Sequence, residues 1–83
     1  MMETMLCNEM GTAYIRASEI KQVKFYRKAE TVNTMEVSRD VVNWIVWGVT
    51  GPNPKEGFFF GAFDTEEKAR DFTRQIVKEL EEA

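Results

Sequence analysis

Residues 41–63 read VVNWIVWGVTGPNPKEGFFFGAF, and they set the architecture of the chain. Two runs rich in β-branched and aromatic residues, near 41–50 and 58–63, flank a stretch that contains two glycines and two prolines. β-branched and aromatic side chains favour strands, and clustered Gly, Pro and Asn favour a reversal of the chain. The pattern therefore predicts two antiparallel strands joined by a hairpin loop longer than the two-residue minimum.

Both faces of this hairpin carry large apolar side chains. Successive residues of a strand point to opposite faces, and an antiparallel sheet normally places polar residues on a face that water covers. In either register, tryptophan and phenylalanine occupy both faces here. In the first strand, one face carries Ile45, Trp47 and Val49 and the other carries Val42, Trp44 and Val46. In the second strand, one face carries Phe58 and Phe60 and the other carries Phe59 and Phe63.

The C-terminal segment predicts an amphipathic helix over residues 65–80. Asp64 and Glu67 have the spacing of a capping box, in which one side chain accepts from free amides and the other reaches back. Glu66 and Arg70 have the spacing of a helical ion pair. We expect the last turn to fray, because glutamates lie there at the negative end of the helix dipole. The apolar stripe with the 3.6-residue period consists of Ala69, Phe72, Ile76, Val77 and Leu80.

The segments upstream of the hairpin predict further strands. Residues 22–28 alternate between apolar and polar or amphipathic side chains, as a half-buried strand does. Residues 14–17 predict another strand, and residues 5–7 predict a first edge strand. Residues 31–40 are mixed in character, so they either extend a long hairpin or form a mobile loop.

Together these elements predict an α+β fold. The expected arrangement is a meander of four or five mostly antiparallel strands followed by one C-terminal helix that packs on one face of the sheet, in the order β-β-β-β-α. A chain of 83 residues supports one hydrophobic core. We therefore expect a single domain over residues 1–83.

Composition narrows the classes of function. The net charge of −3 argues against whole-molecule attraction to nucleic acid or to an anionic membrane. The chain has no histidine, which removes the side chain most used in general acid–base catalysis and the most common metal ligand. We expect no enzymatic activity, no cofactor and no bound metal.

Cysteine usage and hydropathy bear on the compartment. The single cysteine, Cys7, cannot form an internal disulfide, so we expect it to be a small buried apolar residue in a reduced protein. The chain shows no signal peptide and no run of about 18 apolar residues. We expect a cytoplasmic protein that does not interact with a membrane.

The second face of the sheet predicts self-association. Three or four aromatic side chains with apolar neighbours form a patch of roughly 500 Å² or more, which is at or above what a soluble monomer normally exposes. A second copy is the simplest cover, because two-fold dimers dominate among soluble oligomers. Coiling of the sheet into a half-barrel and cover by residues 1–13 are the competing explanations. The candidate dimer contacts, of which only one alternation set applies, are Trp44, Trp47, Phe58 and Phe60.

The leading hypothesis is thus a small homodimeric interaction module, whose further partner the sequence does not identify. The alternative is weak binding of single-stranded nucleic acid, through lysine and arginine on phosphates and aromatic rings on bases. The ββββα layout resembles that of some single-strand binders, although the chain carries no RNP or GXXG motif. A strand edge protected by lysines explains the same basic cluster and is favoured. The cluster consists of Arg16, Lys21, Lys24, Arg27 and Lys28, with Tyr26 among them.

Overall fold

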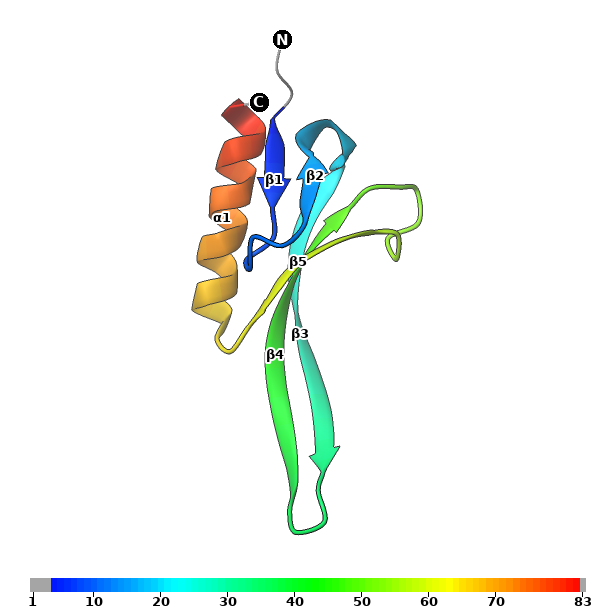
Figure 1. Cartoon of the computed structure of the whole chain (residues 1–83), viewed down its shortest axis with the longest axis vertical. Helices are drawn as coiled ribbons and strands as arrows, with labels where there is room; N and C mark the ends of the chain where they lie inside the picture. The colour runs from blue at the N-terminus through cyan, green and yellow to red at the C-terminus, as the bar shows by residue number, and fades with distance from the viewer. Residues whose placement is uncertain (1–3, 83) are drawn as a thin grey trace.

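The computed structural model describes residues 4–82, which fold into strands and one long C-terminal helix (Figure 1). This confirms the predicted α+β class with antiparallel strands. The elements are β1 (Met5–Cys7), β2 (Tyr14–Arg16), the 3-10 turn η1 (Ala17–Glu19), β3 (Gln22–Asn33), β4 (Ser38–Val49), β5 (Gly57–Phe63) and α1 (Glu66–Glu82).

The strands form two sheets, which corrects the predicted single meander. A three-stranded antiparallel sheet has the order β3-β4-β5, and β1 pairs only with β2. The short hairpin turns at Asn8, whose Oδ1 accepts from the amides of Thr12 and Ala13 at 2.9 and 3.3 Å. It contacts the central sheet through its apolar side chains and through a hydrogen bond from the Glu9 amide to the Phe60 carbonyl at 2.7 Å. The sheet therefore does not continue from β2 into β3.

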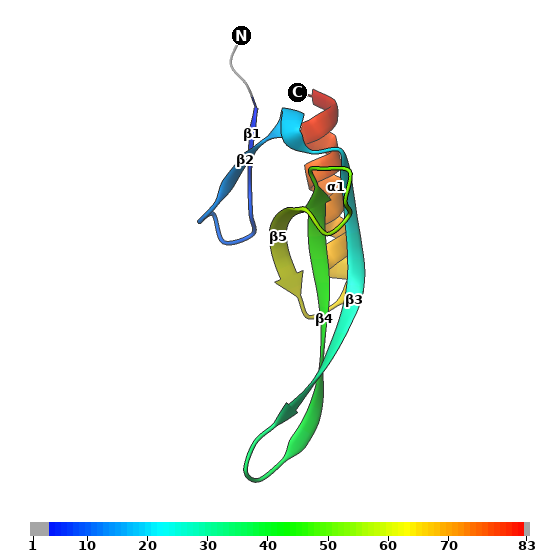
Figure 2. The same cartoon turned by 90° about the vertical axis from the view of Figure 1, so that its right-hand side faces the viewer.

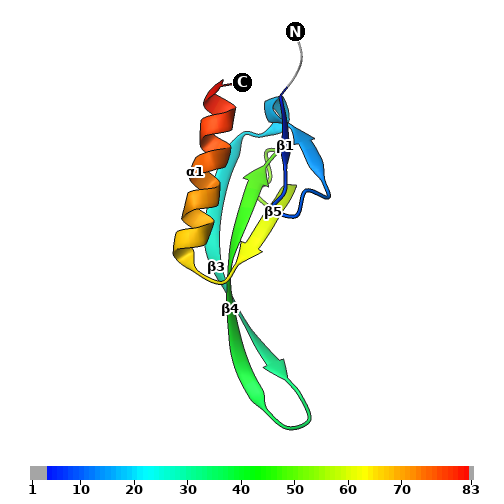
Figure 3. The same ribbon diagram turned by 60° about the vertical axis from the view of Figure 1, so that its left-hand side comes forward.

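The β3–β4 hairpin is much longer than its neighbours. It pairs from Gln22 opposite Val49 to Asn33 opposite Ser38, whereas β5 pairs with β4 only from Trp44 onward. The part beyond β5, residues 28–43, is called the arm below. It extends away from α1 and the small sheet, which lie at the other end of the hairpin (Figures 1 and 3). Of the two expectations for residues 31–40, the extended hairpin is confirmed.

A bulge in β5 changes the predicted alternation. Val46 lies opposite Gly61 and Trp47 lies opposite Phe59, so Phe60 is an extra residue with no partner on β4. As a result Phe63 lies on the same side as Phe58 and Phe60, 5.3 Å from the Phe72 ring of α1. The prediction that Phe63 shares a face with Phe59 is wrong, because one inserted residue inverts the alternation that follows it.

The core lies between the central sheet, α1 and the small sheet. Phe60 has no exposed surface and its ring centroid lies 6.2 Å from that of Phe72. A Cβ at Gly48 would lie 2.7 Å from the Phe60 ring, so glycine gives this ring its space. The other buried members of the core include Leu6, Ile15, Val46, Ala69 and Ile76. The N-terminal hairpin thus fills the same core as the helix.

The ends of α1 differ in detail from the expected ones. Thr65 Oγ1 accepts from the Lys68 amide at 3.3 Å, while the Asp64 carboxylate pairs with Lys68 Nζ at 2.9 Å. This pairing with Lys68, rather than a capping box with Glu67, lowers the pKa of Asp64. The predicted pair of Glu66 and Arg70 is confirmed at 2.6 Å. The helix continues to Glu82, two residues past the predicted end.

Two further observations concern Cys7 and the length of the helix. Cys7 is exposed, which corrects the expectation of burial: Leu6 points into the core, so its neighbours in β1 point outward.

Over residues 4–82, no helix has the length and apolar character needed to cross a bilayer.

The molecule is extended for its size. Its radius of gyration is 14.8 Å, against about 12 Å for a compact chain of this length. Its accessible surface is 6242 Å², against about 5100 Å² for a compact monomer of this mass. The side view shows the arm as a two-stranded ribbon with no other element beside it (Figure 2).

Candidate functional site

The face of the central sheet opposite α1, called the far face below, carries aromatic and basic side chains together. Lys24 lies directly across from Trp47, and Trp47 directly across from Phe59. Tyr26 is 42% exposed and Phe59 is 48% exposed. The predicted alternation of residues 22–28 is confirmed, since Val23 and Phe25 pack toward the core on the other side.

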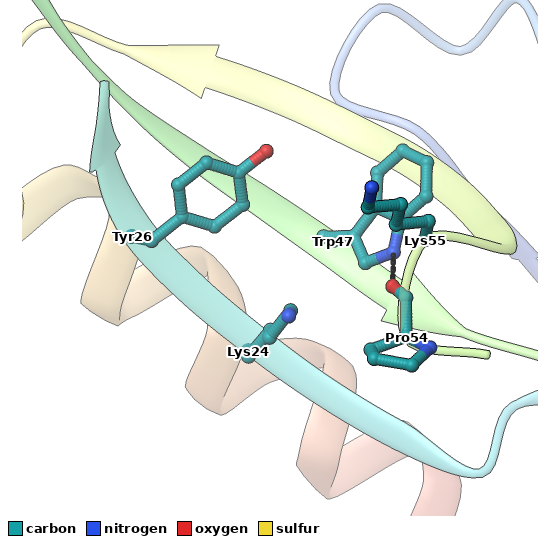
Figure 4. A pocket seen from close by; sticks show the side chains of 5 residues that line it. All are labelled: Lys24, Tyr26, Trp47, Pro54 and Lys55. Carbon is teal, nitrogen blue, oxygen red and sulfur yellow. Dashed lines mark hydrogen bonds between the residues drawn. The ribbon is translucent and has the colours of Figure 1, made fainter. Parts of the chain in front are cut away.

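A shallow hollow of about 350 Å³ lies on the far face. Figure 4 shows its lining, with α1 behind the sheet. The loop after β4 closes one side, because Trp47 Nε1 donates to the Pro54 carbonyl at 3.2 Å. Asn53 Oδ1 accepts from the Lys55 amide at 2.9 Å and shapes the loop that holds this proline. The lining residues are Lys24, Tyr26, Trp47, Pro54 and Lys55.

Gly57 allows the loop to close against the indole. A Cβ at this position would meet the Gly48 carbonyl oxygen and would lie 2.7 Å from Trp47 Nε1. Since the carbonyl is backbone, it cannot move aside as a flexible side chain would. Any other residue at position 57 would therefore displace either β4 or Trp47.

The charge of the hollow is positive. Its lining contains two lysines and no carboxylate, and Lys24 Nζ lies 5.9 Å from the centroid of the Tyr26 ring. Further along the same face, Lys28 Nζ pairs with Glu30 Oε1 at 3.0 Å. The hydrogen bond and charge of Glu30 raise the pKa of Lys28. Chemically, the hollow is suited to an anionic group beside a flat ring.

The four candidate dimer contacts lie on two different faces. Trp44, Phe58 and Phe60 pack on the side of α1, and only Trp47 is on the far face. Phe60 is fully buried inside the chain, which leaves it no surface to present to a second copy. The N-terminal hairpin adds to the cover on the helix side and leaves the lining of the far-face hollow accessible.

The predicted basic cluster is likewise divided. Lys24, Tyr26 and Lys28 share the far face, but Arg27 lies opposite Trp44 on the helix side. Arg16 belongs to β2 of the small sheet, and Lys21 precedes β3. Sequence reasoning missed Pro54 and Lys55. The signal that could have indicated them is Trp47 itself, because a partly buried indole N–H normally finds an acceptor.

A second groove lies between β3 and α1. Phe25 and Val77 contribute apolar surface there, and Arg74 and Lys78 contribute positive charge. The groove measures about 340 Å³. It adjoins the outer edge of β3, which has no neighbouring strand in the described sheets. Within residues 4–82, no three His, Cys, Asp or Glu side chains gather as a metal site would require.

Comparisons with protein-family models, with curated proteins and with solved structures find no match to this chain. The features of the molecule that bear on function are the arm, the far face and the free edge of β3.

Proposed function

We propose that this chain is a small, non-enzymatic, cytoplasmic interaction module that works as a homodimer. The arm carries this proposal. Met35 at its tip is fully exposed, and Val32 and Val37 beside it are also exposed. Apolar side chains grouped on a part of the chain held away from its body are typical of a surface that another chain covers.

The size of the molecule supports the same proposal. The chain exposes roughly 1100 Å² more than a compact monomer of its mass, taking the 6242 Å² observed against about 5100 Å² expected. A standard protein–protein interface buries about 800 Å² on each partner. The surplus surface is therefore of the size that a stable dimer contact uses.

Concentration dependence of unfolding tests the homodimer. Dimerisation stabilises the folded state by mass action, so the urea midpoint of a dimer rises with protein concentration, whereas that of a monomer stays fixed. We expect the midpoint to rise over a wide range of protein concentration. A midpoint independent of concentration, with one cooperative transition, would contradict the proposal.

A second candidate function is binding of single-stranded nucleic acid, which the far-face hollow favours. Trp47 and Tyr26 offer ring surfaces for bases, and three lysines on or beside the hollow, Lys24, Lys28 and Lys55, offer charges for phosphates. Titration of an oligothymidylate into the protein, followed by tryptophan fluorescence, tests this function. Three phosphate contacts predict a slope of about −2 for the logarithm of affinity against that of salt concentration. Absence of quenching at low salt would exclude this role.

A further inference from the structure

We propose that two copies join through the outer edges of their β3 strands, antiparallel and centred on Ala29. The two three-stranded sheets then form one continuous sheet of six strands. This inference rests on the proposed homodimer and names its contact. It makes the arm, rather than the aromatic far face, the main interface.

The edge of β3 is free to pair. It runs for twelve residues, and β4 occupies only its inner side. Alternate residues of such an edge direct amide and carbonyl groups outward, which suits the addition of another strand. Lysines along an edge normally oppose pairing. The register must therefore give each basic residue a suitable neighbour on the second copy.

Symmetry and charge select one register. Two residues that lie opposite each other in an antiparallel pair have their side chains on the same face of the sheet. A two-fold axis perpendicular to the sheet must therefore place one residue opposite its own copy, since an axis between two neighbouring residues would pair side chains from opposite faces. Axes through Arg27, Lys28 or Glu30 place like charges directly opposite each other. An axis through Tyr26 places Lys24 opposite Lys28. Each of these arrangements is destabilising.

The axis through Ala29 gives complementary pairs. It places Lys28 opposite Glu30 of the second copy, and by the two-fold symmetry it also places Glu30 opposite Lys28 of the second copy. It also places Tyr26 opposite Val32, an aromatic and β-branched pair of the kind that stabilises sheets. Alanine at the axis itself leaves room for the two strands. Within β3, no other centre brings opposite charges together without also opposing like charges.

The same register gives the tip of the arm a surface to cover. Met35 lies six residues after Ala29 and Val23 lies six residues before it, so the tip of one copy reaches the start of β3 in the other. There it approaches the groove between β3 and α1, where Phe25 and Val77 are apolar. Glu36 at the tip has the charge opposite to that of Arg74 and Lys78 in the groove, whose lining contains one carboxylate, Glu81.

A mixing experiment tests the register. Lys28→Glu alone and Glu30→Lys alone each place two like-charge pairs across the axis, so each should weaken homodimerisation by about 10- to 100-fold. When the two variants are mixed, every cross-strand pair becomes attractive again, although the pair within each chain stays repulsive. We expect native mass spectrometry to show heterodimers and few homodimers. Lys24→Glu, a matched charge change opposite Thr34, should leave the affinity within a few fold.

Cross-linking provides a second readout. In a Cys7→Ser background, Ala29→Cys should form an intermolecular disulfide on mild oxidation, because residues on the axis have Cα atoms within disulfide range. Thr31→Cys, which lies opposite Arg27, should not. A wild-type monomer would overturn both this inference and the proposed function. A wild-type dimer with no heterodimer on mixing and no Ala29→Cys cross-link would overturn the β3 contact and leave the homodimer standing.

Discussion

Phe59 and Phe60 are adjacent in the sequence, yet the bulge in β5 gives them opposite surroundings. Phe60 is fully buried against Phe58 and Phe72, whereas Phe59 is 48% exposed on the far face. Phe60→Ala should therefore cost about 3 to 5 kcal/mol of unfolding free energy, the range for a phenylalanine removed from a packed core. Phe59→Ala should cost about 1 kcal/mol, since only half of its side chain leaves water on folding.

The assay is urea unfolding at one fixed protein concentration, followed by tryptophan fluorescence. With a slope of about 1.5 kcal/mol/M, Phe60→Ala lowers the midpoint by roughly 2 to 3 M, and Phe59→Ala lowers it by less than about 1 M. The total stability of a chain of this length is only about 4 to 12 kcal/mol, so the Phe60 variant is close to unfolding in water. Equal losses, or a larger loss for Phe59→Ala, would refute the placement of the bulge and the burial that follows from it.

Three further predictions concern the far face and the helix. Gly57→Ala should destabilise the fold by about 1 to 3 kcal/mol in a thermal melt, because its Cβ would meet backbone and the Trp47 indole; a melt unchanged from wild type would contradict the tight loop. Asp64→Asn should reduce the loss of stability in acid. Because the pKa of Asp64 in the folded chain lies below its ordinary value of 3.8, its ionised carboxylate stabilises the fold at a pH above 3.8, and this stabilisation disappears as the pH falls through the folded pKa. The urea midpoints at acid and neutral pH should therefore differ less in the variant, and an unchanged difference would contradict this role of Asp64. Trp47→Ala should abolish any quenching by oligothymidylate but leave the dimer intact, and a monomeric Trp47→Ala variant would return the interface to the far face.

Much of the secondary structure follows from local pattern. The helix over 66–82 was predictable because its signals, an apolar stripe with a 3.6-residue period and acidic residues in its first turn, involve residues that are close together in the sequence. The strands predicted over residues 22–28 and near 41–50 followed from alternation and from β-branched and aromatic runs, and both lie within longer observed strands apart from the last residue of the second. Residues 31–40 stayed ambiguous because the arm has no core to impose an alternation on it.

The bulge and the division into two sheets were not predictable from pattern. An inserted residue in β5 depends on the fit of Phe60 into space left by Gly48, which involves two strands and a helix. The small sheet of β1 and β2 contacts the central sheet through a hydrogen bond from the Glu9 amide to the Phe60 carbonyl, a contact between segments too far apart in the sequence to leave a local pattern. Both decide which aromatic side chains reach the surface, so the sequence alone could not show which of the four candidate contacts share a face.

The residues that line the far-face hollow were likewise only partly predictable from the sequence. Lys24 and Tyr26 were predictable as neighbours on one face of a strand, because a period of two fixes them. Pro54 and Lys55 reach the hollow through a loop whose path depends on an Asn53 turn and on the acceptor for the Trp47 indole. Loop paths of this kind depend on contacts that are distant in the sequence.

The mass of the wild-type chain in solution tests self-association most directly. Sedimentation equilibrium should give twice the chain mass of 9.6 kDa, or 19.2 kDa, with dissociation toward the monomer only on strong dilution. A particle of 9.6 kDa at every accessible concentration would show that the arm stands uncovered in an isolated chain and would contradict the account.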